Sequence, residues 1–305
     1  MEDYPRTLLE LEQRFSTADA CRQYLFSLRW PEGFTCPRCG GRQAWPMARG
    51  LWLCRQCRHQ TSVTAGTVFQ DTRLPLPLWF RAMWYVTSQK NGASALTLQR
   101  VLGLRSYQTS WAWLHKLRRA MVRPGRERLS GVIEVDESYW GAEEEGVVGR
   151  QTHAKALVIV AAQHDGPRKI GRIRMACIPD LTRETLHRFI AEHVEPGSVV
   201  QTDGWAAYGE LAGFQHQPIV VAGSGKVAHE LLPRVHRVVS LLKRWLLGTH
   251  QGAVGQDHLN YYLDEFTFRF NRRTSVSRGK LFYRLVQQAV QVEPHPYRRL
   301  VHPKG

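Results

Sequence analysis

The sequence lacks any run of 18 or more apolar residues, so it predicts no membrane-spanning helix. It also has little cysteine, and six cysteines among 305 residues are too few for the disulfide framework of a small secreted protein. The opening residues, MEDYP, carry acids in place of an apolar stretch, unlike a secretory signal. These absences lead us to expect a soluble protein of the cytoplasm.

Acidic residues are also scarce relative to basic ones. Lys and Arg number 42 against 26 Asp and Glu, which gives a formal net charge of +16. The excess is spread along the chain, which favours a folded protein that binds a polyanion over one with a disordered basic arm. The alternative is a soluble protein that is basic without binding nucleic acid. A hydrophobic content of 43% with 10 Trp is enough for folded cores.

Apolar periodicity and the Pro- and Gly-containing stretches divide the chain into five segments. The largest of them alternates strands with helices, which predicts an α/β domain with a mixed sheet flanked by helices. Its expected strands are 132–136, 156–164, 169–178, 198–202 and 218–222, and its expected helices are 182–194, 233–248, 256–272 and 278–291. The five segments are an N-terminal helical segment (1–30, with a helix over 7–29), a Cys-rich ribbon (31–72), a helical segment with a linker (73–128), the α/β domain (129–292) and a tail (293–305).

Two CxxC pairs in the second segment predict a structural zinc ion. The pairs are Cys36 with Cys39 and Cys54 with Cys57. Each pair places two thiolates on one tight turn, and four sulfurs can close a tetrahedron around Zn²⁺. A pair of redox dithiols is the alternative, but ribbon spacing favours zinc. Four thiolate ligands leave no open position, so the ion is expected to be structural.

A short helix from Ser94 to Gly103 followed by a longer one from Ser106 has the spacing of a helix-turn-helix. Polar residues at the start of the second helix could reach base edges, and basic residues at its end could hold phosphates. This pattern is common by chance. It indicates DNA binding here because a ribbon and an excess of basic residues accompany it. The predicted DNA-binding residues here are Gln108, Thr109, Ser110, Lys116, Arg118 and Arg119.

Two aspartates end predicted strands, Asp136 in "IEVDESYW" and Asp203 in "VVQTDGWAAY". If those strands are neighbours, the two carboxylates project into one crevice, where they repel unless a cation lies between them. Mg²⁺ prefers oxygen ligands, and two such ions can support phosphoryl transfer. The alternative is that each Asp caps a strand or turn, as Asp203 could before Gly204. Glu134 shares the strand parity of Asp136, so parity alone does not decide which acid is primary.

A third ligand is expected from the helix that begins at Pro233. It carries His236 and, two turns later on the same face, Lys243. A metal ligand at one end and a cation for phosphate at the other would suit a site that acts on DNA.

These motifs together resemble the DDE-type insertion-sequence transposases that are headed by a zinc ribbon. The resemblance covers nearly the whole chain and is carried by "CPRCG…WLCRQCRHQTSVTAGTVFQDTRLPLPLWF", "EVDESYWG", "QTDGWAAY", "SLLKRWLLGTHQG" and "YYLDEFTFRFNRR". It implies a ribonuclease-H-like catalytic domain, two catalytic Mg²⁺ or Mn²⁺ ions, and cleavage and strand transfer at transposon ends. It also implies that Asp136 and Asp203 are the first two acids of the site and that Lys243 is the cation that follows the third.

The third position departs from the family pattern, which has Glu there, or Asn in some members. Here it is His236, a softer ligand than carboxylate. Either the chain has a working Asp-Asp-His site that tolerates or prefers Mn²⁺, or it is a decayed, catalytically silent copy that still binds DNA. A repair nuclease of ribonuclease-H-like fold is a further alternative. Glu134 and Glu230 are predicted as accessory acids.

The resemblance implies double-stranded DNA as partner, both transposon ends and target, and a homodimer or larger assembly on it. A nucleoid-associated protein of prokaryotic type is the matching location. The motif "YYLDEFTFRFNRR" is expected to form an amphipathic helix whose Arg272 and Arg273 meet the DNA backbone.

Overall fold

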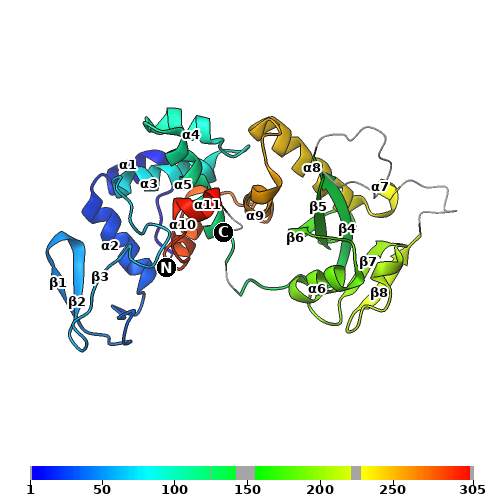
Figure 1. The fold of residues 1–305 in the computed structure, drawn as a ribbon, viewed down its shortest axis with the longest axis horizontal. Coiled ribbons are helices and arrows are strands. Elements are labelled where there is room, and N and C mark those ends of the chain that lie inside the picture. The colour runs from blue at the N-terminus through cyan, green and yellow to red at the C-terminus, as the bar shows by residue number, and fades with distance from the viewer. Residues whose placement is uncertain (1, 124, 142–154, 221–227, 303–305) are drawn as a thin grey trace. The chain divides into compact units, whose positions relative to one another are not determined.

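The computed structural model describes residues 2–123, 125–141, 155–220 and 228–302. The chain folds into two compact units, which Figure 1 shows as a ribbon. Unit 1 comprises Met1–Arg123 and Thr274–Gly305, and unit 2 comprises Pro124–Arg273. Both ends of the chain therefore belong to one unit, and the segment between them forms the other.

The first helical segment of unit 1 consists of two helices, where the sequence predicted one over 7–29. Helix α1 (Leu8–Arg14) ends before Phe15, and α2 (Ala18–Arg29) begins after Thr17. The hydroxyl oxygen of Thr17 accepts a hydrogen bond from the Ala20 N–H at 3.2 Å. A threonine that caps the next helix in this way competes with continuation of the first, which explains the break.

The ribbon and the helical pair follow. Strands β1 (Ala44–Met47), β2 (Leu51–Cys54) and β3 (Gln60–Ser62) form an antiparallel sheet in that order. The expected helix-turn-helix spacing is present in α4 (Ala95–Leu102) and α5 (Tyr107–Ala120). Ser94 caps α4, and Gly103 ends it with φ +62°, a left-handed conformation that favours glycine.

The core of unit 1 is completed by the C-terminal end of the chain. The ring of Phe282 in α10 (Arg278–Ala289) lies 5.7 Å from Phe80 and 5.9 Å from Trp84, both in α3 (Leu76–Ser88). Helix α11 (Tyr297–Val301) follows in the same unit. The predicted α/β domain extended to residue 292, whereas this packing assigns α10 to unit 1.

Unit 2 contains a five-stranded mixed sheet of order β6-β5-β4-β7-β8. Strands β4, β5 and β6 pair antiparallel, whereas β4–β7 and β7–β8 are parallel. This confirms the predicted α/β domain with a mixed sheet flanked by helices. The elements are β4 (Val132–Trp140), β5 (Ala156–His164), β6 (Ile170–Ile178), α6 (Arg183–His193), β7 (Val199–Asp203), β8 (Gln215–Ile219), α7 (Ala228–Leu231), α8 (Pro233–His250) and α9 (Leu259–Phe270), with short 3-10 helices at Ala206–Tyr208 and Gln256–His258.

Each face of this sheet has its own hydrophobic core. On one face, Ile133 and Val135 of β4 pack with Leu186 and Ile190 of α6. On the other, residues of β5 and β6 pack with α8 and α9. Figure 1 shows α6 and α8 on opposite sides of the sheet. Because side chains alternate along a strand, Glu134 and Asp136 of β4 point to the opposite face from Ile133 and Val135, which is the α8 face.

The outer edge of β6 is occupied by side chains of α9 and the turn after it. Asn271 accepts from the Ile173 N–H at 2.8 Å and donates to the Ile173 carbonyl at 3.1 Å, as a neighbouring strand would. Asn260 accepts from the Cys177 N–H at 2.8 Å. These contacts satisfy backbone groups that a free edge would expose.

Among the described helices, none combines the length and the apolar character needed to cross a lipid bilayer.

Candidate active site

The two predicted catalytic aspartates occupy equivalent places on neighbouring parallel strands. The last paired residues of β4 and β7 are Glu134 and Gln201, and two residues farther along these strands come Asp136 and Asp203. Paired strands lie about 4.8 Å apart, and a two-residue step keeps the same face. Both carboxylates therefore start from one level of the sheet on the α8 side, as the sequence predicted.

Helix α8 brings His236 to this level. Its Nε2 lies 3.6 Å from Oδ2 of Asp136, too far for a hydrogen bond but close enough for both atoms to bind one ion at about 2.1 Å. Lys243 is exposed farther along α8. Asp203 is farther from this pair. Among the described residues, no third ligand atom lies within 4.8 Å of both Asp136 and His236. Two carboxylates and an imidazole are a donor set that fits Mg²⁺ or Mn²⁺.

The next acid along β4, Glu137, points to the opposite face of the sheet and contacts a buried tyrosine. The buried Tyr208 hydroxyl donates a hydrogen bond to the Glu137 carboxylate. Burial, followed by the charge of Glu137 and then by those of Asp136 and Asp203, raises the pKa of Tyr208 well above its usual value. Negative charge thus accumulates at the tips of β4 and β7 from both sides of the sheet, which makes a nearby cation favourable.

The predicted accessory acids have other surroundings. Glu134 faces the α8 side, as its parity required, but it is 1% exposed and its two oxygens accept hydrogen bonds from Arg234 and Val235. Glu230 is exposed on α7. The structure therefore gives Glu134 a role in contacts with α8 and not as an accessory ligand.

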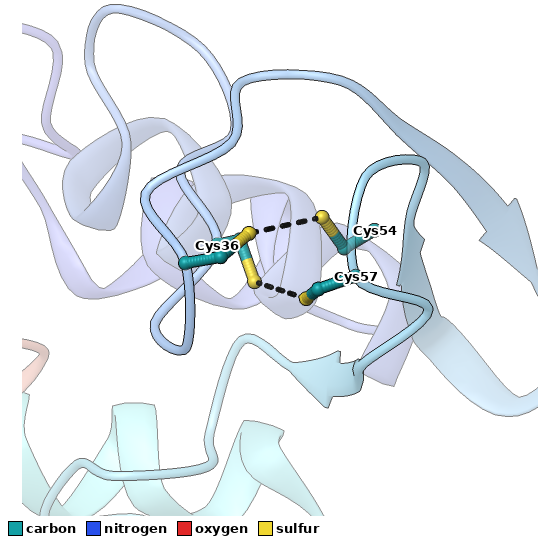
Figure 2. A group of neighbouring side chains, drawn as sticks. Cys36, Cys54 and Cys57 are labelled. Carbon is teal, nitrogen blue, oxygen red and sulfur yellow. Dashed lines mark hydrogen bonds between the residues drawn. The ribbon is translucent and has the colours of Figure 1, made fainter.

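In the ribbon, the sulfurs of the four cysteines lie within 4.8 Å of one another. Figure 2 shows sulfurs from two turns pointing toward each other, with Cys36 Sγ 3.6 Å from Cys57 Sγ. Cys39 Sγ lies 3.7 Å from Cys54 Sγ. A tetrahedron with Zn–S bonds of about 2.3 Å has edges of about 3.8 Å, so the group fits one Zn²⁺ ion.

The turns around the four sulfurs leave little free space. A Cβ atom on Gly41 would lie 3.3 Å from the sulfurs of Cys39 and Cys54 and 2.7 Å from the Gln56 side chain. Backbone N–H groups of Cys57 and Gln56 lower the pKa of the Cys54 thiol to about 7. The Gly41 N–H lowers the pKa of Cys39, but hydrogen bonds with the other three cysteines raise that pKa to about 12. The predicted structural zinc site is therefore supported by its geometry.

Two family models match the chain. Residues 16–60 match a transposase zinc-ribbon domain, and residues 128–271 match an ISXO2-like transposase domain. The chain belongs to the zinc-ribbon-headed DDE transposases of insertion sequences. The second match begins and ends close to the bounds of unit 2, and the first covers α2 and the ribbon.

Two individual proteins are also similar to this transposase. It is 28% identical over 272 residues to an uncharacterized protein in transposable element ISH50 of Halobacterium salinarum, a match that covers 80% of this chain and 88% of that protein. A crystal structure of the catalytic core domain of BIV integrase aligns with 49% of this chain and 89% of its own, at 15% identity and a TM-score of 0.33.

The predicted DNA-binding residues of α5 divide by exposure. Gln108 is exposed, and Thr109, Lys116 and Arg119 are half-buried. Ser110 and Arg118 are buried, at 0% and 1% exposure, so these two predicted DNA contacts are corrected. Both lie on the face of α5 that packs into the core of unit 1, because an amphipathic helix turns every third or fourth residue inward.

Arg272 and Arg273 of the transposase make contacts within unit 2. Arg272 Nη1 donates to the Phe268 carbonyl at 3.2 Å. Arg273 donates to the carbonyls of Gly171 and Ile170 in β6 and lies over the Phe270 ring at 4.1 Å. These arginines bind backbone carbonyls of α9 and β6, and because Arg273 is also exposed, their contact with the DNA backbone stays a prediction.

The structure also places side chains that sequence reasoning missed. Around the α4–α5 turn, Arg100, Arg105 and Tyr107 are exposed, and Tyr107 precedes Gln108 in the first turn of α5. The charge of the two arginines was a signal in the sequence, but their exposure depends on which face of α4 packs on α5. Arg234 was missed because only the fold brings it to Glu134.

Proposed function

We propose that this transposase binds the ends of its element and cuts and joins DNA at the site of Asp136, Asp203 and His236. The observation that carries the proposal is the 3.6 Å approach of His236 to Asp136 on α8, with Asp203 at the same level of the next strand. Three segments that are far apart in the sequence thus carry the oxygen and nitrogen donors that divalent-metal phosphoryl transfer would use.

In the proposed mechanism, Asp136, Asp203 and His236 would hold the divalent ions, with Asp136 as the ligand that both ions would need. Two bound Mg²⁺ or Mn²⁺ ions would supply the stabilisation of attacking and leaving oxygens that this chemistry requires. The chain's own part is to orient these ligands and to hold the DNA. Lys243, exposed on α8, would bind a phosphate close to the scissile one.

The charge distribution of the transposase supports DNA as the partner. Between Cys36 and Gln60 the ribbon has five arginines and no acidic residue. Arg55 and Arg58 lie over the exposed Trp45 ring at 4.8 and 5.3 Å, and all three side chains can face a nucleic acid. With Gln108 and Thr109 of α5, this surface would recognise the terminal inverted repeats.

Asp136→Asn tests the catalytic proposal. The amide keeps the size of the side chain but removes the charge that a divalent ion requires, so metal-dependent cleavage of the element's end DNA should be abolished. Binding of that DNA by the ribbon and α5 should be unchanged in a mobility-shift assay. Retained cleavage would exclude Asp136 from the site.

A catalytically silent DNA-binding protein is the second candidate, favoured by His236 at a position where the family has Glu or Asn. It predicts that wild-type protein binds end DNA but produces no nick with either Mg²⁺ or Mn²⁺. A repair nuclease would instead cut DNA without inverted repeats and join no ends. One assay with both ions and both substrates separates the three.

Transposition also requires two ends to be held at once. We therefore propose a homodimer or larger assembly on DNA, acting in the cytoplasm at the nucleoid. Light scattering of the protein with and without paired end DNA measures this directly.

A further inference from the structure

Helix α8, which carries His236, begins without a side-chain cap of its own. Its N-cap residue is Leu232, and Pro233 occupies its first position. The N–H groups in the first turn of a helix have no partner within the helix. Here two of them, from Arg234 and Val235, donate to Oε2 of Glu134 at 2.7 and 2.9 Å. A residue of strand β4 therefore takes the place of the capping side chain.

The other oxygen of Glu134 is also engaged. Oε1 accepts from Arg234 Nη1 at 3.0 Å and lies 3.0 Å from His164 Nε2 at the end of β5. Four donors match the four acceptor sites of an ionised carboxylate, which leaves none for a metal ion. Arg234 continues to the carbonyls of Gly166 and Pro167 at 3.0 and 2.7 Å. One buried carboxylate thus joins the start of α8 to β4, β5 and the β5–β6 turn.

We propose that Glu134 is the positioning residue that sets His236 beside Asp136. It stands two residues before Asp136 on the same face of β4, and the amides that it holds belong to the two residues immediately before His236. No flexible segment intervenes between the two ligands and the carboxylate that connects them. The negative charge of Glu134 also lies at the positive end of the α8 helix dipole, where it stabilises the helix. This inference rests on the proposed function, in which His236 is the third ligand.

Glu134→Gln is the test. Gln keeps the volume of the side chain but replaces one acceptor oxygen by an NH₂ group, which cannot accept the hydrogen bonds that this oxygen receives. Glu265→Gln is the matched control. Glu265 is fully buried in the same unit and accepts from Arg269 Nε at 2.8 Å, but it lies on α9, which carries none of the proposed metal ligands. Both variants should lower the melting temperature, since each disrupts a buried carboxylate–arginine pair.

Two readouts on the full-length, zinc-loaded protein separate positioning from stability. Without added Mg²⁺ or Mn²⁺, hydrogen exchange of the first turn of α8 should accelerate in Glu134→Gln and not in Glu265→Gln. Mn²⁺ affinity, measured by electron paramagnetic resonance, should fall about 10- to 100-fold in Glu134→Gln only, the range found when a residue that orients a ligand is lost. Equal effects of the two variants, or unchanged Mn²⁺ affinity in folded Glu134→Gln, would overturn the inference.

The double variant with His236→Ala shows whether Glu134 acts through the histidine. If it does, adding Glu134→Gln to His236→Ala should change Mn²⁺ affinity by less than about twofold, because the shared effect is already lost. An undiminished further loss would mean that Glu134 acts on the metal by another route and would refute the inference. If His236→Ala alone left the affinity unchanged, the proposed third ligand would fail as well, whereas a weakening by His236→Ala without one by Glu134→Gln would refute only the positioning role.

Discussion

Glu134 and Asp136 are carboxylates two residues apart on one face of β4, and their surroundings give them different chemistry. Glu134 is enclosed by N–H donors, whereas Asp136 has the His236 imidazole 3.6 Å away and Asp203 on the next strand. Strand alternation was enough to predict that both face one side. The division of roles could not be predicted, because the partners of Glu134 come from residues 164, 234 and 235, and only the fold brings them together.

His236 gives a prediction about ion preference. Carboxylate suits Mg²⁺ better than imidazole does, so His236→Glu should raise the ratio of Mg²⁺-supported to Mn²⁺-supported cleavage on the order of tenfold. Initial rates of end nicking in each ion measure the ratio. His216→Glu serves as a control because His216 lies on β8, where its Nε2 is 2.9 Å from the Thr202 hydroxyl. A ratio that did not change in His236→Glu would argue against His236 as a ligand.

At the scale of elements, apolar periodicity located the strands and helices of unit 2 closely, since 156–164 was predicted as a strand and β5 is Ala156–His164. The misses have local causes. Strand β4 runs to Trp140, past the predicted 136, because its second half pairs with β5 despite its polar residues. Strand β8 begins at Gln215, in the polar stretch QHQPI, whose composition gives little strand signal.

Helix α9 gives a prediction about the sheet edge. Asn271→Ala removes both the acceptor for the Ile173 N–H and the donor to its carbonyl. The loss should lower the free energy of unfolding of unit 2 by about 1–3 kcal/mol, the cost of leaving such groups unsatisfied. Urea unfolding followed by tryptophan fluorescence measures it. Gln23→Ala, on the exposed side of α2 in unit 1, should change stability by less than about 0.5 kcal/mol, and an equal effect of both variants would contradict the assignment.

On the scale of the whole molecule, the two units divide the work into a proposed DNA-recognition part and a proposed catalytic part. We expect the ribbon to depend on a bound zinc ion, because strands of three and four residues bury too little apolar surface to stay folded alone. Sequence spacing predicted this site fully, since all four ligands lie in two short turns. The catalytic site, assembled from three distant segments, could be predicted only in part.

Removal of zinc gives a prediction at this scale. A strong chelator should release one Zn²⁺ per chain and unfold the ribbon, because a structural zinc contributes about 10–16 kcal/mol to folding in such small motifs. Hydrogen exchange should then rise within residues 36–62 and leave the sheet of unit 2 protected. Affinity for end DNA should fall. A ribbon that stayed protected after zinc release would contradict the structural role of the metal.

The assignment of α10 was the largest difference between prediction and structure. Its apolar stripe correctly predicted a helix with one buried face, and 278–291 closely matches Arg278–Ala289. Periodicity reports that a face is buried but not against which partner. Leu281, Phe282 and Leu285 would have suited the α/β domain as well as the core of unit 1 that they join.

Because α10 supplies part of that core, the N-terminal half of the protein cannot finish folding while it emerges from the ribosome. The nascent chain must wait, with Phe80 and Trp84 uncovered, until translation has passed through unit 2 and delivered Phe282. A product that ended before α10 would therefore leave this hydrophobic surface open to chaperones and proteases, and the proposed recognition of DNA would arise only in chains that include α10.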